Sequence, residues 1–247
     1  MKLFVDLGNT AVKWATEDEL DAHRLHREQV DDLVDTLDRV WSKLPPPSEV
    51  AISSVRHQDL QDGMIQWIRK NWPSKVTLAQ TRKSENGVTN GYAKTSQLGV
   101  DRWLAILGSW NLVHSSVLVV DCGTATTLDA IDARGVHLGG LILPGVRGFS
   151  RCLLSSTDLD TTPLQGKIDV FATDTATAIE SGAILTHVCI IKDVLLKLQR
   201  VAQTQHEVQC LLTGGDAALL APHLGINYQL IPDLVLQGLA LQSRNSD

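Results

Sequence analysis

Two strand-turn-strand segments lie nearly half a chain apart in this protein: KLFVDLGNTAVKWAT at residues 2–16 and SVLVVDCGTATTLDAI at residues 116–131. In each segment an apolar, strand-like run ends at an acid, Asp6 or Asp121. A short turn containing glycine and small polar residues then leads into a second strand-like run. The repetition predicts two copies of one α/β unit.

The rest of the chain alternates between strand-like and helix-like patterns. Prolines stop two of the expected helices, and an acidic residue, Asp101, opens a third, where the helix N-terminus favours negative charge. The last long helix carries an apolar stripe, which we expect to pack across a sheet or a partner. The expected strands are 2–5, 11–16, 50–55, 116–120 and 128–131, and the expected helices are 29–43, 59–72, from 101 onward, 175–202 and 217–220.

Composition excludes several classes of protein. The chain has 247 residues and 43% hydrophobic content, enough for a substantial core, and its net charge of -6 offers no basic surface for nucleic acid. The short apolar start is not typical of a signal peptide, and no apolar run predicts a membrane span. The four cysteines and eight histidines show neither zinc-site spacing nor a disulfide framework. We therefore expect a cytoplasmic protein with no nucleic-acid or membrane partner.

The repeated turns carry the chemistry of a phosphate site. Each combines an acid, a glycine that lets the backbone approach a ligand, and small polar donors, which suits a phosphate and its metal ion. One such turn also occurs in ordinary hairpins, but two at strand tips can clamp a nucleotide from both sides. A third turn, LLTGGDA at residues 211–217, could accommodate adenosine against its glycines or simply join a strand to a helix.

Together with further motifs, these turns resemble the type III pantothenate kinases along the whole chain. The resemblance implies an α/β fold of two duplicated ribonuclease H-like domains of the actin-like ATPase type, at residues 1–115 and 116–247, with a cleft between them. The pair of Gly-x-Asp-Arg and Asp-x-Gly-Thr-Ala-Thr does most to separate this family from sugar kinases. The motifs are DLGNT at 6–10 with Lys13, LGVDRW at 98–103, DCGTAT at 121–126, LPG at 143–145, DTATAIESG at 174–182 and TGG at 213–215.

The resemblance also implies an activity and a set of site residues. The family uses ATP with Mg²⁺ to phosphorylate the terminal hydroxyl of pantothenate, the first step toward coenzyme A, and implies a monovalent cation, K⁺ or NH₄⁺, and a homodimer. By analogy Asp101 accepts the proton and Asp121 binds the cation. The ATP residues are Asp6, Leu7, Gly8, Asn9, Thr10, Ala11, Val12, Lys13 and Thr124, and the pantothenate residues are Tyr92, Gly99, Val100, Asp101, Arg102 and Thr175.

Each of these roles has a simpler structural alternative. Phosphoryl transfer needs positioning and charge neutralisation, so an acid beside the acceptor hydroxyl is sufficient, yet Asp101 could merely cap its helix. Arg102 could bind the pantothenate carboxylate or keep Asp101 ionised. Asp121 could be satisfied by its own turn, and Tyr92 could be a half-buried aromatic residue.

Two functional alternatives remain at this point, and one residue departs from the family pattern. The chain could be another kinase or a phosphohydrolase of the same superfamily, or a non-catalytic regulatory protein, since some family members were described as accessory factors for transcription. The family commonly has proline three residues after the tyrosine, where this chain has Thr95. We therefore expect a less rigid loop from Tyr92 to Gly99.

Overall fold

A computed structural model describes residues 1–55, 58–154, 166–202 and 207–244. The chain forms two compact units: Met1–Leu112 joined by the C-terminal segment from Asp233, and Val113–Pro232. Within the described residues, no helix is long and apolar enough to span a membrane.

The first domain is built on a five-stranded mixed sheet with the order β3-β2-β1-β4-β5. β1 is antiparallel to β2 and parallel to β4, so the expected N-terminal hairpin is confirmed. Its strands are β1 (Lys2–Leu7), β2 (Ala11–Thr16), β3 (His26–Gln29), β4 (Glu49–Ser54) and β5 (Lys75–Leu78).

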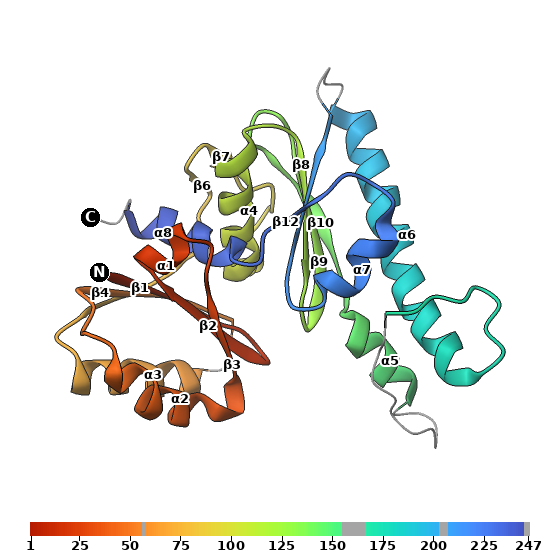
Figure 1. Ribbon diagram of the computed structural model, residues 1–247. Coiled ribbons are helices and arrows are strands. Elements are labelled where there is room, and N and C mark those ends of the chain that lie inside the picture. The colour runs from red at the N-terminus through yellow and green to blue at the C-terminus, as the bar shows by residue number, and fades with distance from the viewer. Residues whose placement is uncertain (56–57, 155–165, 203–206, 245–247) are drawn as a thin grey trace. The chain divides into compact units, whose positions relative to one another are not determined.

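Helices α2 (Leu33–Arg39) and α3 (Gln58–Asn71) cover one face of this sheet (Figure 1). The single helix expected at residues 29–43 is interrupted: 3₁₀ turns at Val30–Asp32 and Trp41–Lys43 flank α2. The second turn swings the indole of Trp41 fully into the core, where it stacks on Trp72 at 5.7 Å between ring centroids. Burying this large aromatic surface accounts for the interruption.

The C-terminal helix α8 (Leu234–Arg244) packs in the first domain, against β1 and β4 and beside α4 (Val100–Val113) (Figure 1). The expected division at residue 115 assigned this helix to the second domain. Two glycines explain its actual position. A Cβ on Gly238 would overlap the Leu104 carbonyl, and one on Gly108 would lie 2.6 Å from the Leu234 carbonyl, so α4 and α8 approach each other through side-chain-free surfaces.

The second domain repeats the same sheet, with the order β10-β9-β8-β11-β12. Each strand corresponds in position and direction to one of the first sheet, with β8 equivalent to β1, which confirms the predicted duplication. The strands are β8 (Val117–Cys122), β9 (Ala125–Ile131), β10 (His137–Pro144), β11 (Gln209–Thr213) and β12 (Gln229–Leu230).

Helices α6 (Thr175–Ala202) and α7 (Ala217–Leu224) cover one face of the second sheet (Figure 1). The bounds of α6 match those expected from the sequence. Its apolar stripe is buried against the core residues of this sheet. The stripe is therefore covered within its own domain. It is formed by Ile184, Val188, Ile191, Leu195 and Leu198.

Candidate active site

The first phosphate turn joins β1 to β2 in the first domain. The Gly8 amide donates to the carbonyl of Ala11 over 3.1 Å, which closes the turn and leaves Asn9 and Thr10 exposed at its tip. The side chains of three other expected ATP residues, Leu7, Ala11 and Val12, are buried in the domain. These three can offer a nucleotide only their backbone groups.

Asp6 and Lys13 lie directly opposite each other across this hairpin, with Oδ2 and Nζ 3.9 Å apart. Burial raises the pKa of Asp6 above its usual value of 3.8, Lys13 opposes the rise, and the negative charge of Asp101 adds to it. The expected base and the first phosphate turn therefore belong to the same domain, where the charge of Asp101 acts on Asp6.

Asp101 lies in the first turn of α4, as predicted, and its Oδ1 accepts a hydrogen bond from the Arg102 amide over 2.7 Å. A Cβ at position 99 would lie 2.7 Å from the same oxygen, so Gly99 provides the room that this carboxylate occupies. Val100 opens the helix beside them. The Gly99–Arg102 segment thus forms a compact acidic helix start.

Arg102 is buried and contacts Tyr92, another expected pantothenate residue. Its Nη1 donates to the Tyr92 hydroxyl over 3.0 Å, and its guanidinium carbon lies 5.6 Å from the centroid of the tyrosine ring. Tyr92 in turn is held by its backbone, because its amide donates to Oδ1 of Asn90 over 2.9 Å. Asn90 is fully buried and was not among the expected site residues.

The second phosphate turn joins β8 to β9 in the second domain. The Gly123 amide donates to the Ala125 carbonyl over 3.0 Å, the counterpart of the bond that closes the first turn. Thr124 is exposed at the tip. Asp121 stands at the same place in its sheet as Asp6 in the first, since β8 is equivalent to β1.

Two glycine turns of the second domain converge on this second phosphate turn. The Gly145 amide donates to the Thr124 carbonyl over 3.0 Å, and a Cβ there would overlap the carbonyl of Gly123. Gly214 has a φ of 92°, and a Cβ there would lie 2.5 Å from Oδ1 of Asp121. Three motifs far apart in the sequence therefore meet at the ends of neighbouring strands of the second sheet.

An ion pair beside these turns was not expected from the sequence. Arg147, at the start of α5 (Val146–Leu154), places its Nε 2.8 Å from Oδ1 of Asp216, which directly follows the glycine pair. The Asp216 amide also donates to the carbonyl of Cys122 over 2.9 Å. No local sequence pattern predicts an ion pair between residues so far apart in the chain, although each residue lies next to a glycine motif.

Thr175 and Asp121 complete the expected set. Thr175 is exposed at the first position of α6 in the second domain, and Asp174 before it accepts a hydrogen bond from the Thr177 amide, which holds the pKa of Asp174 below its usual value. Among the described residues, no cluster of three or more His, Cys, Asp or Glu side chains could hold a metal ion. A cation at Asp121 would therefore need backbone or ligand oxygens as well.

The duplicated sheets define the class of protein: a two-domain α/β protein of the actin-like ATPase and sugar-kinase fold. The structure of a candidate N-acetylmannosamine kinase from Listeria monocytogenes aligns with 100% of this chain and 99% of that protein's chain. The two share 12% sequence identity and superpose with a TM-score of 0.51. A candidate transcriptional activator of the Baf family from Campylobacter jejuni aligns over 99% and 98% at 20% identity, with a TM-score of 0.66. These likenesses concern the fold alone.

Sequence relatives identify the family. The model of the type III pantothenate kinase family matches residues 2–197. Type III pantothenate kinases from Nitrosospira multiformis and Nitrosomonas eutropha are 35% and 33% identical to this chain, covering 99% of it in both cases and 91% and 95% of their own lengths. The chain belongs to the type III pantothenate kinase family.

Proposed function

We propose that this protein transfers the γ-phosphoryl group of ATP to the terminal hydroxyl of pantothenate, the first step of coenzyme A biosynthesis. Family membership supports the reaction. The observation that carries it is the grouping in one domain of Asp101 with both the phosphate turn at Asp6 and the pair formed by Tyr92 and Arg102.

The proposed mechanism relies on positioning and charge. The backbone of the turn from Asp6 to Lys13 and the exposed Thr124 hold ATP with Mg²⁺, and the Lys13 ammonium offsets phosphate charge. Asp101 accepts the proton of the attacking hydroxyl at a carboxylate oxygen. Mg²⁺ supplies neutralisation of the charge on the phosphates when it is bound.

The remaining residues bind pantothenate in this proposal. Tyr92, Gly99, Val100 and Arg102 surround the acceptor together with Thr175. Of the two roles considered for Arg102, binding of the substrate carboxylate fits its contact with the Tyr92 hydroxyl, because the two side chains then form one polar surface.

A monovalent cation, K⁺ or NH₄⁺, is proposed to bind at Asp121. This carboxylate ends β8 directly before the second phosphate turn, and the close approach of the Gly214 backbone to its Oδ1 brings peptide groups to the same place. A carboxylate with carbonyl oxygens suits a hard cation.

We also propose a homodimer in which Thr175 reaches the pantothenate site of the neighbouring subunit. The stripe of α6 no longer supports this, because it is buried within its own domain. Support comes instead from exposed apolar side chains on the edge strand β10, of which Ile142 is 64% exposed. Leu138 and Leu141 are exposed on the same strand. We expect this dimer in the cytoplasm.

An assay of ADP release separates the proposed reaction from its alternatives. We expect ATP turnover that depends on pantothenate and yields 4'-phosphopantothenate. Release without any acceptor would identify a phosphohydrolase, and release that requires a hexose would identify a sugar kinase. A folded protein that binds ATP without turnover under any of these conditions would support a regulatory role.

A further inference from the structure

The loop between β5 and α4 carries Tyr92 and ends at Gly99, two residues before Asp101. It contains a short hairpin, β6 (Ser84–Glu85) and β7 (Val88–Thr89), which turns at Asn86 and Gly87 with φ values of 48° and 80°. We call residues 79–99 the substrate loop. Its conformation decides where Tyr92 lies relative to Arg102.

The side chain of Gln242, on the C-terminal helix α8, pairs with both backbone groups of a loop residue, as the backbone of a neighbouring strand would. Oε1 of Gln242 accepts from the Gln80 amide over 2.8 Å, and Nε2 of Gln242 donates to the Gln80 carbonyl over 2.9 Å. The Nε2 also donates to Oε2 of Glu85 over 2.5 Å. Gln242 is 4% exposed, so these bonds are shielded from water.

Glu85 also contacts α4 and a second residue of the loop. Its Oε2 accepts from Nε1 of the buried Trp103 over 3.4 Å, and its Oε1 lies 2.6 Å from Nη1 of Arg82. Trp103 directly follows Arg102, the partner of Tyr92. The Arg82 carbonyl accepts from the Asn90 amide group over 3.4 Å, and Asn90 holds the Tyr92 backbone.

We propose that Gln242 is a positioning residue for pantothenate binding, which acts through Gln80 and Glu85 on the substrate loop. The inference rests on the proposed function of Tyr92 and Arg102. Gln242 is not among the residues assigned to ATP or pantothenate, and its helix also packs on β1 and β4. It sets the affinity for pantothenate while leaving the ATP turns unaffected.

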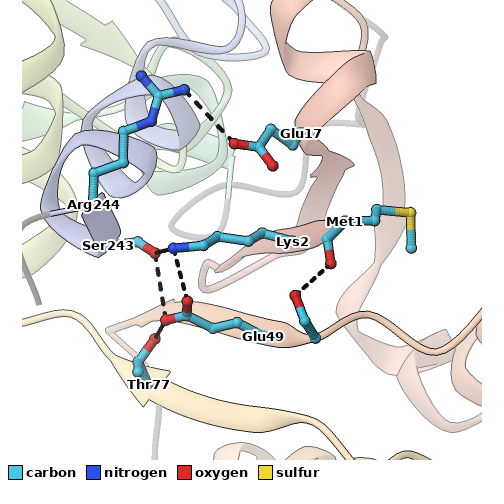
Figure 2. Close-up of polar contacts among 8 residues, drawn as sticks. Met1, Lys2, Glu17, Glu49, Thr77, Ser243 and Arg244 are labelled. Carbon is cyan, nitrogen blue, oxygen red and sulfur yellow. Dashed lines mark hydrogen bonds and ion pairs between the residues drawn. The ribbon is translucent and has the colours of Figure 1, made fainter. Parts of the chain in front are cut away.

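The neighbouring residue on α8 provides a matched control. Ser243 Oγ lies 3.2 Å from Nζ of Lys2 and 3.4 Å from Oε1 of Glu49, and Glu49 also accepts from Thr77 (Figure 2). These contacts tie the same helix to the starts of β1 and β4, and through Glu49 to β5. Ser243→Ala therefore weakens the docking of α8 without touching the substrate loop.

The test compares Gln242→Glu with Ser243→Ala. The glutamate keeps the shape of Gln242 but removes its donor and places a carboxylate against Glu85. Loss of a buried hydrogen-bond donor predicts a KM for pantothenate raised about 10- to 100-fold, with the KM for ATP within about twofold of the parent protein. Adding Glu85→Gln returns a donor to this contact and is expected to recover part of the affinity. Ser243→Ala should lower the melting temperature and leave the KM for pantothenate unchanged.

Two results would overturn the proposal: an unchanged KM for pantothenate in Gln242→Glu, or an equal rise in Ser243→Ala. If the glutamate variant does not fold, Gln242→Ala is measured in the same way. Hydrogen exchange keeps this test separate from the proposed function, because it needs no pantothenate turnover. Amides of residues 80–92 should exchange faster in the Gln242 variants and normally in Ser243→Ala. Unchanged exchange in the Gln242 variants would refute the proposed effect of Gln242 on the substrate loop, even if the protein phosphorylates another acceptor.

Discussion

His187 lies between α6 and the end of β10, and each of its ring nitrogens is close to a backbone carbonyl oxygen. Nδ1 lies 2.7 Å from the carbonyl oxygen of Ala183, one turn earlier in the helix, and Nε2 lies 3.0 Å from the carbonyl oxygen of Pro144. Pro144 directly precedes Gly145, whose amide donates to Thr124 in the second phosphate turn. The buried histidine thus connects the long helix to the segment that supports this turn.

We expect His187→Leu to destabilise the second domain and to weaken ATP binding. The leucine removes the polar contacts of this ring with the Ala183 and Pro144 carbonyl oxygens, and losing a hydrogen bond of this kind costs about 0.5–1.5 kcal/mol. At this chain length that corresponds to a fall of about 1–6 °C in melting temperature. His187→Gln, which keeps a donor, should lose less. Equal melting temperatures for the parent and His187→Leu would contradict the bridging role.

Replacing Asp6 is expected to abolish turnover and to raise the melting temperature. The folded state raises the pKa of Asp6 above 3.8, so folding favours the protonated acid and the ionised form at neutral pH destabilises the domain. Asp6→Asn should therefore melt higher than the parent protein at pH 7, by a few degrees, while turnover is lost.

The difference in stability between Asp6→Asn and the parent protein is expected to depend on pH. Below the unfolded value of 3.8 the acid is protonated in both states, so the advantage of Asp6→Asn should vanish. The advantage grows as the pH rises from there to above the folded pKa. Melting curves between about pH 3 and pH 8 measure it, and an asparagine variant that is less stable at neutral pH would contradict the cause assigned to the shift.

Asp101→Asn should abolish turnover while preserving the fold. The asparagine keeps an oxygen for the Arg102 amide and still fits the space left by Gly99, but it cannot accept the proton. Removing a general base typically lowers kcat about 10²- to 10⁴-fold. Measurements of kcat, ATP affinity and melting temperature decide the role: near-normal kcat refutes the assignment as base, and loss of folding identifies a structural cap.

We expect potassium or ammonium to activate the enzyme through Asp121. The parent protein should turn over faster in potassium buffer than in sodium buffer of equal ionic strength, and Asp121→Ala should lose this difference. Equal rates in both buffers for the parent, with Asp121→Ala as active as the parent, would exclude a cation site at this carboxylate.

The proposed dimer can be tested by complementation. Asp101→Asn and Thr175→Ala should each be impaired alone, and mixing the two should restore activity if Thr175 serves the neighbouring subunit. Random exchange predicts about a quarter of parental activity, because half of the dimers then contain one intact site. Ile142→Lys, on the exposed strand β10, should give a monomer by sedimentation. A fully active monomer would contradict the proposal.

The sequence alone determined the duplicated unit and the family. Asp6 and Asp121 end strands whose apolar runs and glycine turns are local patterns, and local patterns survive any arrangement of the rest of the chain. The bounds of α6 followed from its periodicity for the same reason. The sequence also indicated Asp101 at a helix start and the glycine turn at Gly214, both of which the structure contains.

Tertiary structure decided the features that depend on residues far apart. Gln242 and Gln80 are separated by 162 positions, and no periodicity links them. The place of α8 in the first domain depends on Gly108 and Gly238 facing each other, which two isolated glycines in helical patterns do not announce. The stripe of α6 looked equally suited to a sheet or a partner, and the core of the second domain covers it. Apolar periodicity states that a face is buried, but only packing in three dimensions selects what buries it.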